Sequence, residues 1–106
     1  VLFLGDIVGN PGRNAIKQEL KDQIKKKDIE FVIANGENAA DEGVGITKKI
    51  SEKLFSSGVD VITTGNHVWD QKETADYINT ENRLLRPLNL IKPSPGNGFE
   101  VYKSKN

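Results

Sequence analysis

The segment that best indicates the fold spans residues 31–38 and reads FVIANGEN. A continuous apolar run that stops at Asn-Gly is typical of a strand covered on both faces and followed by a tight turn. Two other runs end in a similar way, because residues 2–6 read LFLGD and residues 59–67 read VDVITTGNH. Segments with helical periodicity separate the three runs. The pattern therefore predicts right-handed βαβ units and a mainly parallel α/β sheet.

The remaining pattern predicts where each helix and strand lies. Ile16, Leu20 and Ile24 recur every four residues, which indicates one buried stripe on an otherwise solvated helix. Residues 9–12 read GNPG and are expected to break the chain before this helix, and residues 36–46 are expected to form a glycine-rich loop. The expected strands are residues 1–6, 30–35, 59–64 and 99–102, and the expected helices are residues 13–27, 47–57 and 69–79.

Composition narrows the functional classes. The 106 residues carry 15 basic and 15 acidic side chains, so no overall field directs the protein to nucleic acid or to a membrane surface. Cysteine is absent, which excludes disulfides and zinc–thiolate sites and is compatible with the reducing cytoplasm, the expected location. No apolar stretch approaches the ~20 residues of a membrane span, so no membrane partner is expected.

Both ends of the chain look cut. The sequence contains no methionine, begins inside an apolar strand and closes just after the expected strand at residues 99–102. We therefore expect a single incomplete domain over residues 1–106, the N-terminal portion of a longer protein whose C-terminal half is absent. A cut sheet edge also favours pairing with another chain, so a homo-oligomer is expected.

Side chains that bind metals follow each of the three apolar runs. Asp6 ends the first run, Glu37 and Asn38 the second, and Asn66 and His67 the third. Because ligands of open α/β sheets bind at the carboxyl ends of the strands, we expect these side chains to converge. Carboxylate and amide oxygens with one imidazole suit Mg, Mn or Fe. Two such cations bridged by Glu37 would polarise a phosphoryl group and activate water.

Several other interpretations stay open at this point. Taken singly, the strand-end residues could be turn formers, and the one histidine could be structural. Residues 5–13 could instead form an anion site in which the amides of Gly5, Gly9 and Gly12 hold a phosphate, although neither nucleotide-binding glycine motif is present. No G-x-S-x-G motif supports a serine esterase. The lysines at positions 17, 21, 25, 26 and 27 are most simply a solvated helix face.

Three motifs carry a resemblance to a known family. They read GDIVG at residues 5–9, NGENAA at residues 35–40 and TGNHVWD at residues 64–70. Together they resemble the calcineurin-like metallophosphoesterases, and more narrowly their bacterial YmdB-like branch, which is associated with hydrolysis of 2′,3′-cyclic nucleotides and other phosphodiesters. The resemblance implies the N-terminal half of a two-sheet αββα sandwich. Its implied substrate is a small phosphodiester or nucleotide, with RNA as a further candidate.

The resemblance also implies a role for each strand-end residue. Asp6 would bind the first of two divalent metal ions (Mn, Fe or Mg), and Asn38 would add an amide oxygen to the same ion. Glu37 would bridge both ions, and Asn66 would bind the second. His67 would be catalytic rather than a ligand, because an imidazole can stabilise or protonate the leaving oxygen.

Asp70 has two possible roles under the same resemblance. It would either orient His67 or begin the following helix, where a carboxylate interacts favourably with the helix dipole.

The chain departs from the superfamily pattern in two places. Val8 stands where the superfamily has a histidine ligand, and no histidine follows His67, although the family supplies further ones from its second half. We therefore expect the 106-residue chain alone to be inactive or weakly active. Two alternatives to an enzyme remain, namely a phosphate- or nucleotide-binding module without catalysis and a regulatory protein that keeps a vestigial site.

Overall fold

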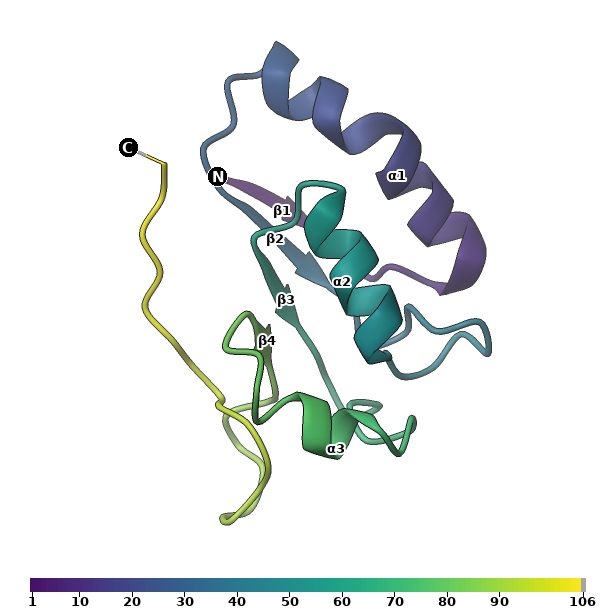
Figure 1. Cartoon of the computed structure of the whole chain (residues 1–106), viewed down its shortest axis with the longest axis vertical. Coiled ribbons are helices and arrows are strands. Elements are labelled where there is room, and N and C mark those ends of the chain that lie inside the picture. The colour runs from purple at the N-terminus through teal and green to yellow at the C-terminus, as the bar shows by residue number, and fades with distance from the viewer. Residues whose placement is uncertain (106) are drawn as a thin grey trace.

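The computed structural model describes residues 1–105, which form a four-stranded sheet with helices between the strands (Figure 1). All three strand pairs are parallel, and the strand order β1-β2-β3-β4 follows the chain. The predicted parallel α/β fold is therefore confirmed. The strands are β1 (Leu2–Leu4), β2 (Val32–Asn35), β3 (Val61–Thr63) and β4 (Leu84–Leu85), and the helices are α1 (Gly9–Lys26), α2 (Lys48–Ser56) and α3 (Thr74–Tyr77).

Helices α1 and α2 lie on the same face of the sheet and contact each other (Figure 1). The reason is that each right-handed crossover moves the sheet one strand further in the same direction. Leu20 of α1 and Leu54 of α2 are buried against Val32, Ala34 and the rest of the core. This layer holds the strands in register and so places their carboxyl ends at one edge.

Helix α1 begins four residues earlier than predicted, because residues 9–12 form its first turn instead of breaking the chain. Pro11 is tolerated there, since the first turn has no partner for its missing N–H and its fixed φ is already helical. Gly9 makes the entry with φ +59°, and a Cβ on Gly12 would lie 3.1 Å from Ile7 Cγ2. The glycines therefore let the helix start tightly against the end of β1.

The helix predicted over residues 69–79 is also wrong in extent, since only α3, Thr74–Tyr77, is helical. Side-chain hydrogen bonds to a distant loop hold the preceding residues in turns. Gln71 Nε2 donates to Glu42 Oε2 (3.2 Å) and to the carbonyl of Val44 (3.3 Å), and Thr74 Oγ1 donates to the carbonyl of Ile46. These tertiary contacts compete with a longer helix.

The strand predicted at residues 99–102 is absent from the described part of the chain, where Phe99 and Val101 are exposed. The fourth strand is instead β4, whose Leu84 pairs with Ile62 of β3 and is 1 % exposed. A two-residue strand has no periodicity to detect, which is why the sequence pattern missed it.

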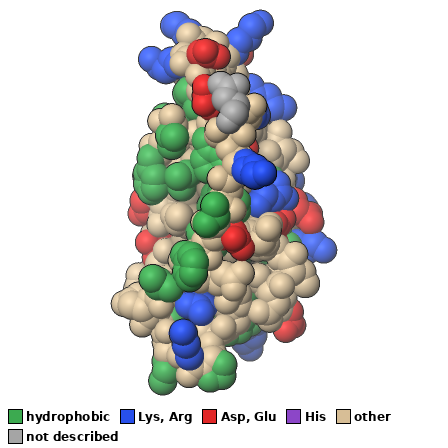
Figure 2. Space-filling model, turned by 90° about the vertical axis from the view of Figure 1, so that its left-hand side faces the viewer, with side chains coloured by type: hydrophobic (Ala, Val, Ile, Leu, Met, Phe, Trp, Pro, Cys, Tyr) green, Lys and Arg blue, Asp and Glu red, His purple; other side chains and the backbone are tan. Residues whose placement is uncertain are grey.

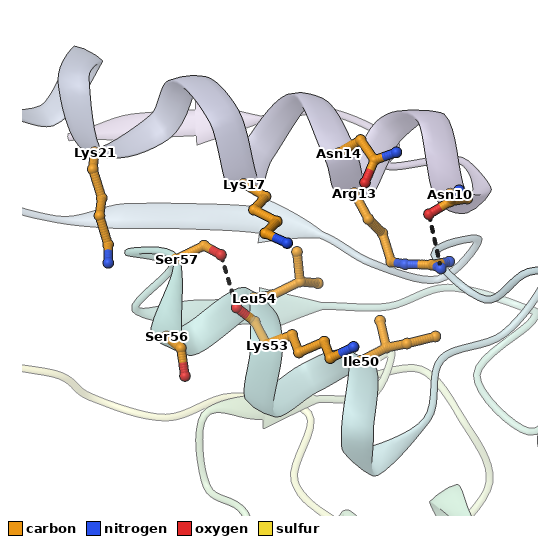
Figure 3. Close-up of a pocket in the computed structure, with 10 residues that line it drawn as sticks. All are labelled: Asn10, Arg13, Asn14, Lys17, Lys21, Ile50, Lys53, Leu54, Ser56 and Ser57. Carbon is orange, nitrogen blue, oxygen red and sulfur yellow. Dashed lines mark hydrogen bonds between the residues drawn. The ribbon is translucent and has the colours of Figure 1, made fainter.

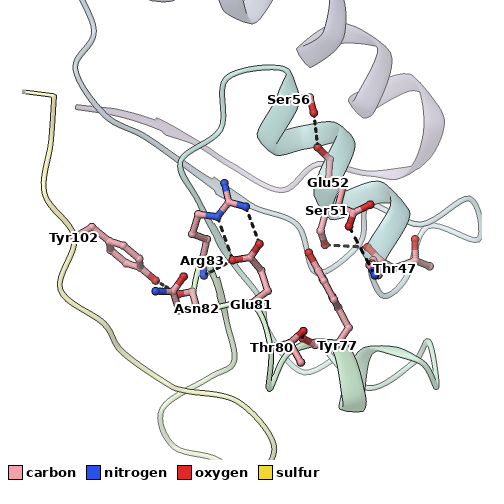
Figure 4. A network of polar contacts seen from close by, with 11 residues as sticks. Thr47, Ser51, Glu52, Ser56, Tyr77, Thr80, Glu81, Asn82, Arg83 and Tyr102 are labelled. Atoms are coloured by element: carbon pink, nitrogen blue, oxygen red, sulfur yellow. Dashed lines mark hydrogen bonds and ion pairs between the residues drawn. The ribbon is translucent and has the colours of Figure 1, made fainter.

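A polar network fastens β4 and the C-terminal segment to α2 (Figure 4). Arg83 forms an ion pair with Glu81 (Nη2 to Oε1, 2.7 Å), and its guanidinium carbon lies 3.9 Å from the ring centre of Phe55 in α2. The hydrogen bond from Arg83 lowers the pKa of Glu81. Tyr102 Oη donates to the carbonyl of Asn82, which holds the C-terminal segment beside the sheet.

The face of the sheet away from α1 and α2 has no helical cover within the described residues. Figure 2, which views the molecule from the side of the C-terminal segment, shows hydrophobic side chains gathered in a band on this face. Phe3 of β1 is 61 % exposed, in contrast to the buried residues beneath the helices. No helix within residues 1–105 is both long enough and apolar enough to cross a membrane.

Candidate metal centre

The structure places the predicted site residues at the same edge of the sheet. Asp6 follows β1, Glu37 and Asn38 follow β2, and Asn66 and His67 follow β3. The three strands are neighbours and parallel, so their carboxyl ends point the same way (Figure 1). This edge is where open α/β sheets bind ligands.

Asp6 and Asn38 are in direct contact. Asn38 Nδ2 donates to Asp6 Oδ1 (3.0 Å) and Oδ2 (3.2 Å), although the two residues lie 32 positions apart in the chain. The Asn38 carbonyl accepts from the amide of Gly9 (2.9 Å), which fixes the backbone beneath the side chain. With its amino group turned to Asp6, Asn38 has its amide oxygen Oδ1 buried and without a hydrogen-bond partner.

Glu37 lies against the end of β3. A Cβ added to Gly65 would fall 2.1 Å from Glu37 Oε2, so only glycine leaves room for this carboxylate. The Glu37 amide donates to Asn35 Oδ1 (3.3 Å), and its carbonyl accepts from the amide of Gly45 (2.5 Å). The backbone is thus held on both sides while Oε2 stays buried without a partner.

The two unpartnered oxygens, Glu37 Oε2 and Asn38 Oδ1, indicate whether these residues could bind a cation. A buried acceptor without a donor costs about 1–3 kcal/mol, and a bound cation would supply the missing interaction to each of these oxygens. Carboxylate and amide oxygens are donors that Mg and Mn accept. Within residues 1–105 no three His, Cys, Asp or Glu side chains come together to hold a metal. The donor set therefore fits a divalent cation but makes only part of its shell.

Asn66 is exposed on the turn that follows Gly65, the residue against which the Glu37 carboxylate lies. The structure therefore shows Asp6 in contact with Asn38, and Glu37 packed against the turn that carries Asn66. The metal-binding roles of these four residues stay predictions.

His67 and Asp70 form a pair on the same turn. His67 Nδ1 lies 2.7 Å from Asp70 Oδ2, and the Asp70 amide donates to the His67 carbonyl (3.1 Å). Both side chains are a little over one third exposed, so solvent and substrates can reach the imidazole. Since α3 begins only at Thr74, Asp70 is not a helix-start residue, and the contact supports the orienting role. Because the carboxylate contacts Nδ1, the second ring nitrogen, Nε2, is not engaged by Asp70.

Two arginines near this edge were not predicted from their residue types. Arg13 on α1 donates to the carbonyl of Ala39 (2.5 Å) and pairs with Asp41 (2.5 Å), which fastens the loop after Asn38 to the helix. Arg86 follows β4, is 9 % exposed and has its Nε buried without a partner, while its Nη1 donates to the Pro87 carbonyl (3.0 Å).

The alternative phosphate cradle at residues 5–13 is not favoured. The Gly9 amide donates to the Asn38 carbonyl (2.9 Å), and the Gly12 amide donates to the Val8 carbonyl (3.3 Å). Both amides are therefore used inside the protein and are not available to an anion.

Taken together, the chain is an α/β protein of the metallophosphoesterase type, with oxygen donors and one histidine at the strand ends. It belongs to the YmdB-like family, whose model, described as YmdB-like protein, matches residues 2–106. The family resemblance seen in the three motifs is thereby confirmed.

Three relatives place the chain within this family. It is 45% identical over 104 residues to the 2′,3′-cyclic-nucleotide 2′-phosphodiesterase of Bacillus subtilis (strain 168), covering 98% of this chain and 39% of that protein. The crystal structure of a hypothetical protein from Thermus thermophilus superposes with a TM-score of 0.86 at 38% identity, covering 95% of this chain and 38% of that one. The crystal structure of a phosphatase from Mycoplasma pneumoniae gives a TM-score of 0.83 at 39% identity, covering 94% and 38%. The chain thus spans about two fifths of the length of these relatives.

Proposed function

We propose that this chain contributes the N-terminal ligand set of a metal-dependent phosphodiesterase that acts on 2′,3′-cyclic nucleotides or related phosphodiesters. The observation that carries the proposal is the pair of buried, unpartnered oxygens, Glu37 Oε2 and Asn38 Oδ1, together with the contact between Asn38 and Asp6. The name of the Bacillus subtilis relative supports the substrate class.

Most of the residues at the strand ends would bind metal ions, and His67 would transfer a proton. Two divalent cations, with Mn, Fe and Mg as candidates, would polarise the phosphoryl group and lower the pKa of a bound water. Asp6, Asn38, Glu37 and Asn66 would hold them. In the reaction, the water oxygen bonds to phosphorus and the bond from phosphorus to one ribose oxygen breaks.

His67 would donate a proton to that leaving ribose oxygen. Its Nδ1 side is held by Asp70 at 2.7 Å, so the Nε2 proton is the one that can be donated. The contact with the carboxylate also keeps the ring in one orientation for the transfer. The pair therefore acts as an oriented general acid at the rim of the site.

A direct assay tests this proposal. The intact protein is expected to hydrolyse bis-p-nitrophenyl phosphate and 2′,3′-cyclic AMP, to lose activity with EDTA and to regain it with Mn. Glu37→Gln and His67→Ala are expected to lower the rate at least tenfold, whereas Glu19→Gln, an exposed carboxylate on α1, is expected to change nothing. Activity that persists in EDTA, or in both site variants, would refute the metal centre assigned here, whereas the absence of hydrolysis with Mn would favour the regulatory alternative with a vestigial site.

The 106-residue chain provides a second comparison in the same assay. Its donor set is partial within the described residues, so it is expected to be inactive or weakly active alone. Turnover equal to that of the intact protein would show that the ligands named above are sufficient. It would refute the idea that residues outside the 106-residue chain supply further metal ligands.

A further inference from the structure

A groove of about 490 Å³ runs between α1 and α2, on the helical face of the protein (Figure 3). Its walls carry four cationic side chains and no acidic one: Arg13, Lys17 and Lys21 from α1 and Lys53 from α2. This is a local excess of positive charge on a chain whose formal net charge is zero. A polyanion is therefore the complementary occupant.

The cations on α1 form a row. Arg13, Lys17 and Lys21 are spaced four residues apart, so successive positions lie about 6 Å apart along the helix. Figure 3 shows Lys17 and Lys21 pointing from α1 towards α2, with Lys53 on the opposite wall. A regular row of charges matches a ligand whose negative charges also repeat along a line.

These cations are available to a ligand. Within residues 1–105, Lys17, Lys21 and Lys53 enter none of the ion pairs. Arg13 is 19 % exposed and is held by Asp41 and the Ala39 carbonyl, so the three lysines are the readily accessible cations and Arg13 adds its charge at one end of the row. Arg13 also bonds to the loop after Asn38, so the groove starts next to the candidate metal centre.

The shape of the groove selects among polyanions. Because α1 and α2 contact each other, the groove is a narrow depression beside their contact, which a flexible single strand can follow more readily than a stiff duplex. Ile50, which is half-buried, lies between the cationic walls and adds apolar surface to the groove. No aromatic residue lines the groove, so recognition would rest on the backbone charges rather than on stacking.

We propose that the groove between α1 and α2 binds the phosphate backbone of a single-stranded nucleic acid. The nucleic acid lies along Arg13, Lys17 and Lys21, opposite Lys53. Its end reaches the candidate metal centre. Binding without sequence preference follows from contacts made to phosphates alone. This binding does not depend on the proposed hydrolysis.

The salt dependence of binding measures how many phosphates are neutralised. For single strands, the slope of log affinity against log salt is about 0.7 per phosphate contact, so three to four contacts predict a loss of about 20- to 50-fold between 50 and 200 mM salt. With the three lysines replaced, only Arg13 remains, and the loss over the same range is expected to be about threefold.

The experiment measures fluorescence anisotropy of a labelled 12-nucleotide 2′-O-methyl RNA with the intact protein in EDTA, so that catalysis does not enter. The variant Lys17→Gln/Lys21→Gln/Lys53→Gln is expected to bind at least about tenfold more weakly at 50 mM salt. The matched control is Lys25→Gln/Lys26→Gln/Lys49→Gln, which removes the same charge from exposed positions of the same two helices outside the groove. The control is expected to bind like the unmodified protein.

Four results would overturn the proposal: no binding at 50 mM salt, equal weakening by the control variant, equal affinity for duplex RNA, or equal competition by polyglutamate of the same charge. The last would assign the groove to an acidic protein surface. Hydrolysis of bis-p-nitrophenyl phosphate by both triple variants checks that they are folded. RNA binding and hydrolysis are measured in separate assays. A wrong proposal for the groove can therefore be distinguished from a wrong proposed function.

Discussion

Gly65 is the position where a single methyl group most directly tests the candidate metal centre. A Cβ there would lie 2.1 Å from Glu37 Oε2, 2.4 Å from Cδ and 2.5 Å from Oε1, well below ordinary contact. To restore contact, the carboxylate in Gly65→Ala has to retreat by roughly 1 Å. The obstacle is the end of a flexible side chain, so the carboxylate moves and the strand does not.

The expected consequence is a loss of function without a loss of folding. Misplacement of a catalytic group by about 1 Å can lower turnover about 100-fold, and we expect kcat/KM of Gly65→Ala to fall by that order. The free energy of unfolding should change by no more than about 1 kcal/mol, because replacing glycine also reduces the entropy of the unfolded chain.

The assay is hydrolysis of bis-p-nitrophenyl phosphate with Mn, together with urea unfolding and titration of bound Mn. Gly5→Ala is the matched control, since it is also a glycine at a strand end and its added Cβ meets nothing within 4 Å. If Gly65→Ala keeps its activity and its Mn affinity, or if Gly5→Ala loses them equally, the role given to the Glu37 carboxylate is refuted.

Three further predictions concern His67 orientation, acid stability and the core. Asp70→Asn is expected to lower kcat about 10- to 100-fold with little change in KM, because the imidazole loses the carboxylate that holds it; steady-state kinetics across pH measures this. The pKa of Glu81 is lowered by the hydrogen bond from Arg83, so its contribution to stability is present above the ordinary pKa of 4.5 and is lost as pH falls through the lowered value. Urea unfolding should therefore show that Arg83→Gln is destabilised at pH 7 and differs little from the unmodified protein at low pH, after Glu81 is protonated. Leu84→Ala is expected to lose about 2–5 kcal/mol of unfolding free energy, against about 0.5 kcal/mol or less for the exposed Leu88→Ala.

Each of these three has a contrary outcome. An Asp70→Asn variant with unchanged kcat would make the 2.7 Å contact structural only. A constant difference between Arg83→Gln and the unmodified protein at all pH values would assign the effect to packing on Phe55 instead of to Glu81. Equal losses for Leu84→Ala and Leu88→Ala would contradict the burial of β4.

The part of the fold that could be predicted is the part in which each strand carries its own signal. The runs ending at Gly5, Gly36 and Gly65 are apolar, and each stops where the backbone turns. The same three stops placed Asp6, Glu37 with Asn38, and Asn66 with His67 at one edge, because residues that follow neighbouring parallel strands share an edge.

What could not be predicted depends on contacts between distant segments. The Arg13–Asp41 pair spans 28 positions, and β4 exists only because Leu84 and Leu85 pair with β3. The helix expected over residues 69–79 is shortened by bonds from Gln71 to a loop 27–29 positions earlier. No local pattern encodes such partners, so propensity alone overestimated the helix.

The strand order β1-β2-β3-β4 has a consequence for how the protein is made. Because each strand pairs with the one synthesised just before it, the sheet can grow at one edge as the chain leaves the ribosome, without waiting for a later segment to insert. The Asp6–Asn38 contact needs only β1 and β2, so it can form before β3 has docked. Each emerging strand end would then be added to a site that is already partly assembled.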